Sequence, residues 1–283
     1  MSGYTCWRCV LVFVRNSAKV RCPISLPTIA EGREIGQAGQ FRLPLAGNWR
    51  QNGGMEVEIL FEDEHCLVAN KPSGVLTQAP PGIDSMEVRV RRYLKSGLPE
   101  GQKPYLALPH RLDRPASGAL LFAKKRKAAR RLGEQFEGRL TDKRYWVVVA
   151  GRVVPPQSTW QDFMRKIPDV AQSEIVPADH PDAQQAVLHY RVIEQTDYSS
   201  WLEIQLETGR THQIRLQTSS RGHPILGDAL YGSTAKFGPD TPDERLRAIA
   251  LHARELTFRH PRTEASIRVD APLPKTWDTL AAR

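Results

Sequence analysis

The chain has 283 residues, 40% of them hydrophobic, so one large domain or two small ones can form a packed core, and a largely disordered chain is not expected. No stretch approaches the roughly 18 apolar residues that a membrane span requires. Lys and Arg number 40 against 31 Asp and Glu, which gives a net charge of +9. This balance favours an anionic partner such as nucleic acid, although an ordinary basic soluble protein could have the same composition.

The four cysteines, Cys6, Cys9, Cys22 and Cys66, do not form the pattern of a disulfide framework. Their distribution favours a reducing compartment, and we expect a cytoplasmic localisation. Cys6 and Cys9 form a C-x-x-C, which could be half of a zinc site or a redox pair. Because no second cluster of Cys and His completes a metal site, we expect no bound metal.

Residues 1–54 differ from the rest of the chain, because they contain no Asp or Glu before Glu31 and are rich in Gly, Pro and basic residues. Three interpretations compete: a targeting segment, a poorly ordered extension, or a gene start placed too early, with the true start at Met55. The segment lacks a convincing amphipathic helix and a long apolar core. We therefore expect a dispensable basic N-terminal extension over residues 1–54 and a folded domain over residues 55–283.

Strand patterns begin after Met55. Val57, Ile59 and Phe61 alternate with acidic residues, which predicts a half-buried strand. Further strands are predicted at residues 66–70, 119–123, 145–149, 187–193, 202–206, 256–258 and 267–269. The strands outnumber the helices and are irregularly interleaved with them, so we expect an α+β domain with a mixed, mostly antiparallel central sheet flanked by helices and loops.

Three helices are predicted. The first follows Ser85 as its N-cap, the second follows the strand at 119–123, and the third spans residues 211–219, with Thr211 as its cap. The first two present basic faces that are either solvated or in contact with phosphates. These basic residues are Arg89, Arg91, Arg92 and Lys95 on the first helix, and Lys124, Lys125, Arg126, Lys127, Arg130 and Arg131 at the second.

The loop before the strand at 119–123 carries a candidate reactive group. Asp113 lies between Arg111 and Arg114 in the segment His-Arg-Leu-Asp-Arg-Pro-Ala-Ser-Gly at 110–118. An exposed loop salt bridge would explain this arrangement and would contribute about 0–1 kcal/mol. The alternative is a carboxylate that nearby cations hold ionised, ready to act as a nucleophile or a base. Composition leaves both interpretations open.

Three further segments could contribute to a site. In residues 207–216, Arg215 is either a surface arginine of a capped helix or an arginine aimed at a carboxylate or phosphate. Residues 221–232 contain three glycines and a proline, which is typical of a shaped loop. Tyr145 lies near the start of a strand and is either a packed aromatic or a ring on which a nucleobase stacks.

Taken together, these segments resemble the RluA (ribosomal large-subunit, type A) family of RNA pseudouridine synthases. The resemblance covers residues 55–277, and each motif alone would be weak. Their joint presence in one order is highly specific: Asn-Lys-Pro-Ser-Gly at 70–74, His-Arg-Leu-Asp at 110–113, Lys-Arg-Tyr at 143–145, Gly-Arg-Thr-His-Gln-Ile-Arg at 209–215, Gly-His-Pro-Ile-Leu-Gly-Asp at 222–228, Leu-His-Ala at 251–253 and His-Pro at 260–261. The resemblance implies the pseudouridine synthase fold.

The resemblance also implies roles for single residues. Asp113 matches the catalytic aspartate of the family, Tyr145 matches the aromatic that packs on the target base, and Arg215 matches the arginine paired with that aspartate. The residues expected to bind the substrate RNA are Arg111, which would enter the RNA helix where the base has left, together with His110, Arg210, His212 and two walls of the uracil pocket, Ile214 and Leu226.

The chain departs from the family pattern in two places. Members usually have Thr directly before the Ser-Gly of the catalytic loop, whereas this chain has Ala116, preceded by Pro115. Because the loop keeps its aspartate, this change puts its geometry and the reaction rate in doubt, not the reaction. In addition, residues 1–54 lack the helical pattern of the RNA-binding domain that some relatives carry at the N-terminus.

The implied reaction converts specific uridines of structured RNA, ribosomal or transfer, to pseudouridine. The C1′–N1 bond breaks, the base rotates and C1′ joins C5, without a redox step or phosphoryl transfer, so we expect no cofactor. An ionised Asp113 would start the reaction either at the uracil ring or at C1′. The target base must first leave its stack, which costs a few kcal/mol.

Two other functions stay open. A non-catalytic RNA-binding or RNA-folding protein could keep the same scaffold, and a carboxylate-dependent hydrolase of a nucleoside or sugar would usually require a second acid beside Asp113. We expect RNA as the partner, no membrane association, no obligate protein partner and a monomer.

Overall fold

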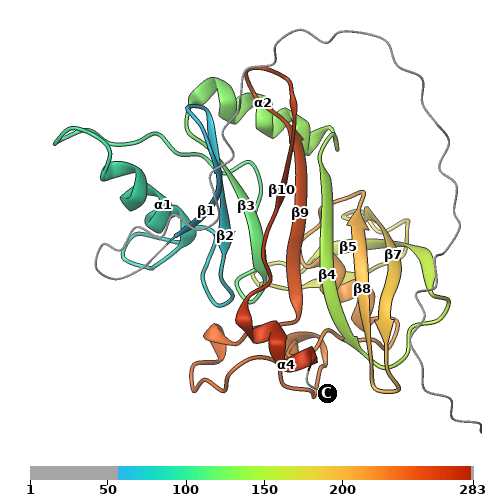
Figure 1. The fold of residues 1–283 in the computed structure, drawn as a ribbon. Coiled ribbons are helices and arrows are strands. Elements are labelled where there is room, and N and C mark those ends of the chain that lie inside the picture. Colours follow the sequence, from blue (N-terminus) through green and yellow to red (C-terminus); the bar gives the residue numbers. More distant parts are fainter. Residues whose placement is uncertain (1–56, 282–283) are drawn as a thin grey trace, which may run out of the picture. The chain divides into compact units, whose positions relative to one another are not determined.

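The computed structural model describes residues 57–281, so the expectations for residues 1–54, including the C-x-x-C, lie outside the described residues and stay predictions. The described strands form one sheet in the order β1-β2-β3-β9-β4-β8-β7-β5-β6, and β10 pairs with β9 outside this path (Figure 1). All pairs are antiparallel except β3 with β9. This arrangement confirms the mixed, mostly antiparallel sheet. Within residues 57–281, no helix has the length and apolar character needed to cross a membrane.

The elements have the following bounds. The strands are β1 (Glu58–Glu62), β2 (Cys66–Lys71), β3 (Ser117–Ala123), β4 (Asp142–Ala150), β5 (Gln157–Lys166), β6 (Ser173–Ile175), β7 (Gln184–Gln195), β8 (Ser199–Leu206), β9 (Leu251–Arg259) and β10 (Ser266–Asp270). The helices are α1 (Met86–Lys95), α2 (Arg126–Glu137), α3 (Gln213–Ser219) and α4 (Asp278–Ala281), with short 3-10 turns at Ala229–Tyr231, Glu244–Leu246 and Lys275–Trp277. The strands β5 and β6 were not predicted from the sequence.

Strands β2 and β3 are buried on both faces. Successive side chains of a strand point to opposite faces, so Val68 and Leu121 pack in a cluster with residues of α2, whereas Leu67 and Leu120 pack in a cluster with residues of α1. Figure 1 shows α1 beside β1 and β2, and α2 near the ends of β3 and β9. This double burial explains why β3 is one continuous apolar run in the sequence.

The predicted alternation of β1 is interrupted by a bulge. Ile59 pairs with Ala69 but Phe61 pairs with Val68, so one extra residue, Leu60, lies between them. As a result Ile59 packs with the α1 cluster and Phe61 packs with the α2 cluster, where its ring contacts Phe258 edge to face. The predicted half-buried strand is therefore confirmed, but Ile59 and Phe61 do not share the face that their alternation implies, because a bulge shifts the period by one residue.

The two halves of the sheet meet where β3 runs parallel to β9, with Ser117 opposite His252 and Gly118 opposite Ala253. Gly118 has φ +117°, and a Cβ placed on it would lie 2.4 Å from the carbonyl oxygen of Ala253. Only glycine can adopt this backbone and let the strands approach so closely. Beside it, the Ser117 hydroxyl and His252 Nδ1 are hydrogen bonded at 2.8 Å, fully buried.

We expect Gly118→Ala to lower the free energy of unfolding by about 3 kcal/mol or more, since the new methyl group meets backbone that cannot move aside. Urea unfolding followed by tryptophan fluorescence measures this change. Gly133→Ala in α2 is the matched control: no atom lies within 4 Å of its added methyl group, and a helical alanine stabilises by up to about 1 kcal/mol. Equal effects at the two positions would contradict the close-approach argument.

The second half of the sheet, in the order β4-β8-β7-β5-β6, covers a separate hydrophobic cluster. Val147, Leu188 and Leu202 form its centre, and Ile214 of α3 and Ile225 pack against them. Thus α3 and the loop that follows it are anchored on this half of the sheet, whereas the Asp113 loop enters β3 on the other half. Any site that uses both segments is assembled across the sheet.

Candidate active site

A cleft of about 1750 Å³ opens where these two segments face each other. Its lining combines polar and apolar groups from the Asp113 loop, the start of β4 and the loop before α3. The residues that line it and were expected in a site are His110, Arg111, Asp113, Tyr145, Arg210, His212 and Arg215. Ile214 and Leu226 are instead buried in the cluster beneath, so they support the floor of this region from below.

The Asp113 loop is fastened to the first half of the sheet by side chain to backbone hydrogen bonds. The Thr77 hydroxyl donates to the carbonyl oxygen of Leu112 at 2.7 Å and accepts from its N–H at 3.1 Å. The Arg114 guanidinium donates to the carbonyl oxygen of Gly74 at 2.8 Å. These bonds fix both neighbours of Asp113 while leaving its carboxylate free to face the cleft.

Lys71 holds the same loop from inside the protein. Its side chain is fully buried, and its ammonium donates to the carbonyl oxygens of Pro72 (3.1 Å), Arg114 (3.0 Å) and Ala116 (2.6 Å). Three acceptors match the three protons of a charged ammonium. Burial opposes the charge and lowers the pKa of Lys71 to about 7, although the nearby Asp113 raises it. Lys71 is therefore a buried amine beneath the Asp113 loop, with three acceptors in place for its protonated form.

We expect Lys71→Met to lower the free energy of unfolding by roughly 2–4 kcal/mol at neutral pH, because buried carbonyls lose their donor. In the wild type, Lys71 releases its proton near pH 7 when folded and near its ordinary value of 10.5 when unfolded. The unfolded state binds more protons between these values, so stability rises with pH in this window, and the contribution of Lys71 is at most about 1.4 kcal/mol per pH unit.

This slope should vanish in Lys71→Met. Urea unfolding of both proteins at several values from pH 7 to 10 measures the difference, in which the other titrating groups cancel. Lys236→Met is the control, because Lys236 is exposed and pairs only with Asp240. Parallel stability curves for the wild type and Lys71→Met would show that Lys71 does not titrate in this range.

The His110 side chain packs within the protein and holds the Asp113 loop in place. Its Nε2 accepts a hydrogen bond from the N–H of Leu121 at 2.9 Å, and its ring stacks on Phe136 with centroids 4.5 Å apart. Burial, with a smaller contribution from the Lys143 charge, lowers the pKa of His110 to about 3. His110 is therefore neutral near pH 7 and links the Asp113 loop to β3 and α2.

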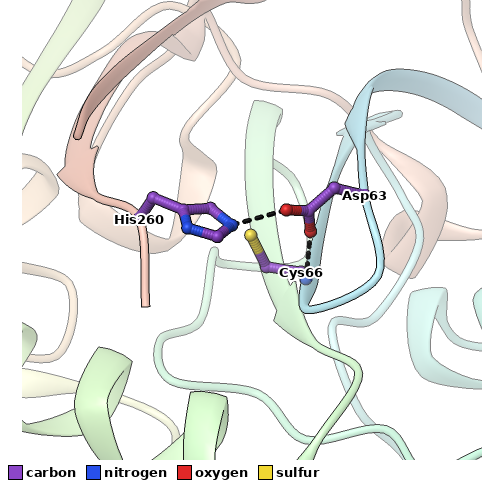
Figure 2. Close-up of side chains that lie close together, drawn as sticks. All are labelled: Asp63, Cys66 and His260. Atoms are coloured by element: carbon purple, nitrogen blue, oxygen red, sulfur yellow. Dashed lines mark hydrogen bonds and ion pairs between the residues drawn. The ribbon is translucent and has the colours of Figure 1, made fainter. Parts of the chain in front are cut away.

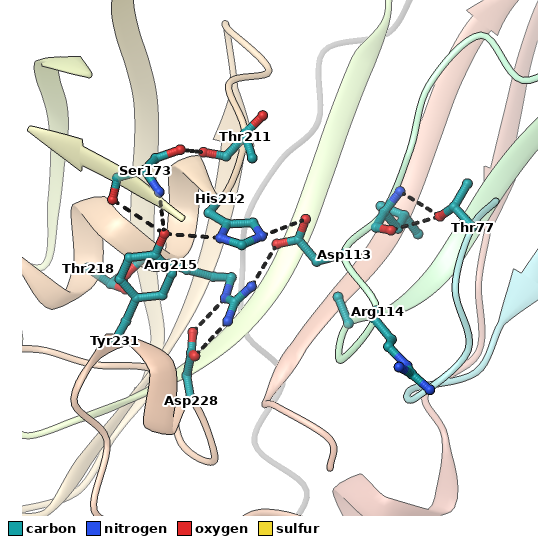
Figure 3. Close-up of polar contacts among 12 residues, drawn as sticks. Thr77, Asp113, Arg114, Ser173, Thr211, His212, Arg215, Thr218, Asp228 and Tyr231 are labelled. Carbon is teal, nitrogen blue, oxygen red and sulfur yellow. Dashed lines mark hydrogen bonds and ion pairs between the residues drawn. The ribbon is translucent and has the colours of Figure 1, made fainter. Parts of the chain in front are cut away.

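The main contact of Arg215 is with Asp228, a residue for which the sequence predicted no role. Its Nε and Nη2 donate to the two carboxylate oxygens of Asp228 at 2.7 and 2.8 Å, and both side chains are buried. Its remaining nitrogen, Nη1, lies 3.4 Å from Oδ2 of Asp113 (Figure 3). Hydrogen bonding and the charge of Asp228 raise the pKa of Arg215 against the opposing effect of burial. The expected neighbour of Asp113 is thus present, held in place by Asp228.

His212 faces the other oxygen of Asp113. Its Nε2 lies 3.7 Å from Oδ1, and its Nδ1 is hydrogen bonded to the Tyr231 hydroxyl at 3.0 Å (Figure 3). The Tyr231 hydroxyl also accepts from the N–H of Ser173 at 3.0 Å and lies 3.5 Å from the carbonyl oxygen of Ser173, so its proton has two acceptors, that carbonyl oxygen and His212 Nδ1. When the hydroxyl donates to Nδ1, the His212 proton lies on Nε2 and faces Asp113. Burial lowers the pKa of His212, although Asp113 raises it, so a neutral imidazole is favoured.

The predicted helix cap at Thr211 was wrong. Helix α3 begins at Gln213, and the residue before it, His212, has φ +55°, which differs from the extended backbone of an ordinary N-cap. The Gln213 side chain closes the turn instead: its Oε1 accepts from the N–H of Arg210 and from the hydroxyl of Thr208. The strained His212 backbone turns its imidazole toward Asp113.

Tyr145 lies on β4 facing the cleft. Burial raises its pKa above the usual range, and the negative charge of Asp113 adds to this effect. Its phenol is therefore protonated near neutral pH, close enough to Asp113 to feel its charge. Arg111 is exposed at the mouth of the cleft. Arg210 is half-buried and donates from Nε to the carbonyl oxygen of Gln185 at 3.0 Å, leaving its terminal nitrogens free of described partners.

The two predicted basic faces differ in the structure. Ser85 caps α1 as expected, but Arg89 pairs with Asp84 and Arg91 pairs with Glu87, so half of the basic residues of α1 are neutralised locally. At α2, Lys124 and Lys125 pair with Glu62 and Glu64. In the described residues Arg126, Lys127 and Arg131 are exposed and have no ion pair, although Arg131 donates one hydrogen bond to the carbonyl oxygen of Pro261, so these three cations are open to phosphate.

Another cluster of polar groups, Asp63, Cys66 and His260, has the composition of a metal site but a structural role (Figure 2). His260 Nδ1 accepts from the N–H groups of Arg262 and Thr263, at 3.2 and 3.0 Å, so it carries no proton. The proton is therefore on Nε2, which donates to Asp63, and the other Asp63 oxygen accepts two N–H groups at the turn after β1. Because Nε2 has no free lone pair, His260 cannot bind a metal without losing this arrangement.

Three residues with structural evidence for a role were not singled out from the sequence: Lys71, Asp228 and Tyr231. Each lies in a segment that was recognised as a motif or a shaped loop, but the spacing does not show which distant group each one meets. A signal did exist for Lys71, because a lysine that continues the buried run of β2 requires partners for its charge.

Comparisons with known proteins agree with this geometry. A family model described as RNA pseudouridylate synthase matches residues 65–220. An uncharacterized RNA pseudouridine synthase of Synechocystis sp. is 35% identical over 230 residues, which cover 79% of this chain and 68% of that protein. Ribosomal large subunit pseudouridine synthase C of Vibrio vulnificus is 34% identical over 218 residues, 76% of this chain and 65% of that protein. The solved structure of human RNA pseudouridylate synthase domain containing 4 matches with a TM-score of 0.64 at 25% identity, covering 79% of this chain and 93% of that one.

Proposed function

The chain belongs to the RNA pseudouridylate synthase family, and on this premise we propose that Asp113 starts the isomerisation of a uridine that has been flipped into the cleft. The observation that carries this proposal is the position of the Asp113 carboxylate in the cleft, with Arg215 beside one oxygen and His212 beside the other. A cation beside one carboxylate oxygen and an imidazole beside the other orient the carboxylate, as a nucleophile requires.

In this mechanism the C1′–N1 bond breaks, the uracil rotates within the pocket and C1′ joins C5, after which C5 loses its proton. Asp113 either adds to the uracil ring or assists at C1′, and both routes use the same ionised carboxylate. Arg215 lies beside the Asp113 carboxylate, and its bidentate pair with Asp228 fixes its position there. The packed groups beneath this part of the site, which include Ile214 and Leu226, close it to water from below.

Tyr145 is proposed to stack on the target base, because its raised pKa keeps the phenol neutral and its proximity to Asp113 places base and carboxylate in one pocket. Because a protonated phenol cannot accept a proton, Tyr145 is proposed to act by stacking and not as the base that removes the C5 proton. Arg111 is proposed to enter the RNA helix at the position that the flipped base has left, which its exposed place at the cleft mouth supports. His110 would act indirectly, by holding the loop that carries both.

The substrate is proposed to be ribosomal RNA rather than transfer RNA, because curated relatives carry the name ribosomal large subunit pseudouridine synthase C. The purified full chain, incubated with an unmodified transcript of large-subunit ribosomal RNA that carries tritium at C5 of uridine, should release tritium to water. Release from a transfer RNA transcript alone would overturn the ribosomal assignment and leave the isomerase assignment intact.

A cytoplasmic location and a monomeric state stay predictions.

The same assay separates the two competing functions. A non-catalytic RNA-binding protein would bind the transcript without releasing tritium. A carboxylate-dependent hydrolase would release free uracil from RNA instead of forming pseudouridine. Hydrolases of this type use a second acid, whereas the described groups nearest the Asp113 carboxylate are Arg215 and His212.

A further inference from the structure

A second group of cations lies on the wall of the cleft beside the Asp113 loop. Arg139 follows α2, Lys143 lies near the start of β4 and Arg210 lies in the loop before α3. All three line the cleft. We call Arg139, Lys143 and Arg210 the rim cations. They come from separate segments of the chain, so the fold brings together three positive charges that the sequence keeps apart.

Arg139 repels each of the other two rim cations. Burial lowers the pKa of Lys143, and the charge of Arg139 lowers it further; burial and Arg139 do the same to Arg210. The nearby acids are Glu207, which lies 3.6 Å from Arg139 but also 3.6 Å from His189, and Asp142, which raises the pKa of Lys143. Among residues 57–281, no carboxylate lies within ion-pair distance of Lys143 or Arg210. The cluster therefore has an excess of positive charge.

The backbone around the rim cations is also specialised. Arg139 has φ +57°, a left-handed conformation that costs a non-glycine residue about 1 kcal/mol or more. At Gly209, directly before Arg210, an added Cβ would lie 3.6 Å from the ammonium of Lys143. Strained backbone and like charges both reduce stability, and a fold that keeps both at the edge of a cleft is typical of a binding site.

The position of the rim cations relative to the base site is defined by β4. Lys143 and Tyr145 are two residues apart on this strand, so their side chains point to the same face about 7 Å apart. The charge of Lys143 also acts on His110, three residues before Asp113. The cations thus lie one step along the strand from the ring proposed to stack on the base, where the sugar–phosphate chain of that nucleotide must pass.

We propose that the rim cations form a phosphodiester-binding subsite, which holds the RNA backbone next to the flipped uridine. The proposal rests on the proposed function for the identity of the RNA, but the anion that it names follows from the charges themselves. A phosphodiester supplies two non-bridging oxygens that share one negative charge, and the guanidinium groups of Arg139 and Arg210 and the ammonium of Lys143 can donate to them. Binding it would relieve the repulsion among the three cations.

The first test compares two charge-matched triple variants of the full chain. One removes the rim cations by Arg139→Asn, Lys143→Gln and Arg210→Gln, with asparagine chosen because it tolerates left-handed backbone. The control removes three exposed cations that do not line the cleft and that pair with acids, by Arg152→Gln, Lys236→Gln and Arg268→Gln. Both lose three charges, so a general loss of attraction affects them equally.

Binding of an unmodified large-subunit ribosomal RNA transcript is measured over a range of salt concentrations. We expect the rim variant to bind at least about tenfold more weakly than the control at 0.1 M salt. The slope of log Kd against log salt concentration should be smaller for the rim variant than for the control, by about one to two. Equal affinities and equal salt slopes for the two variants would overturn the proposal. Thermal unfolding of both proteins shows whether the rim variant is folded, and the second test uses the unaltered protein.

The second test follows the Lys143 ammonium directly by NMR of protein labelled at the lysine side chains, assigned with Lys143→Gln. Uridine 3′,5′-bisphosphate should raise the pKa of Lys143, and uridine should leave it unchanged. Equal responses to the two probes would overturn the subsite. An equal response to inorganic phosphate would assign it to free anions and overturn its assignment to RNA backbone.

The two proposals can fail separately. If the wild type forms no pseudouridine, the proposed function fails, yet the salt dependence and the Lys143 titration still report on the subsite. If the rim variant binds and modifies RNA as the control does, the subsite fails while the isomerase stands.

Discussion

Asp113→Asn is expected to abolish tritium release from C5-labelled RNA, lowering kcat by at least about 10³-fold, because the amide cannot act as the nucleophile. RNA affinity should stay within about threefold of the wild type or become tighter, since the change removes a negative charge from a basic cleft. Stability should change little, because Arg215 keeps its bidentate partner Asp228. Single-turnover assays and binding measurements on the same protein preparations check these three results.

The combination of outcomes matters more than the loss of activity alone. Weak RNA binding by Asp113→Asn would indicate a positioning role for the carboxylate, and retained isomerisation would remove Asp113 from the chemistry altogether. A matched control is Asp240→Asn, which alters an exposed carboxylate that pairs only with Lys236 and should leave both activity and binding unchanged.

Asp228→Asn is expected to reduce both stability and activity, because it breaks the buried pair with Arg215. Removing one partner of such a pair costs up to about 3–5 kcal/mol, and here Arg215 would keep only its more distant carboxylate neighbour, Asp113. The freed guanidinium would also turn toward Asp113, its remaining carboxylate neighbour at 3.4 Å, and neutralise the reactive group. We expect kcat to fall by about 10²-fold or more, with urea unfolding and tritium release as the measurements.

A double variant separates the two effects. Replacing both partners, by Arg215→Met with Asp228→Leu, removes the buried charges together and should restore most of the lost stability. Activity should not return, because Asp113 loses its cation. Recovery of activity along with stability would show that Arg215 serves only the fold.

Much of the fold could be predicted because its signals are local. The apolar run of β3 and the Ser85 cap of α1 depend on neighbouring residues, and both appear in the structure as expected. The bulge at Leu60 could not be predicted, since nothing in the alternation of β1 shows that the partner strand skips a residue. Strand β5 was missed because polar residues interrupt its apolar pattern, and its pairing with β7 supplies the stability that the pattern does not show.

The sequence predicted which residues belong to the candidate site better than it predicted the contacts between them. Asp113, Arg215 and Tyr145 were placed together by resemblance, and the cleft does contain all three. The bidentate pair of Arg215 with Asp228 and the chain from Asp113 through His212 to Tyr231 join residues from different segments. Such contacts depend on backbone geometry, for example the left-handed His212, which spacing does not encode.

The parallel contact of β3 with β9 bears on how the protein is made. The Asp113 loop leads into β3, but Ser117 finds its partner His252 only 135 positions later in the chain, and the segment with His212, Arg215 and Asp228 lies between them. During synthesis, the first half of the sheet therefore cannot join the second half, and the cleft cannot form, until β9 has been made. Contacts between such distant residues slow folding. A growing chain that ends before β9 would carry every residue of the proposed catalytic set without the strand that joins them, so it should be inactive until that strand has been added.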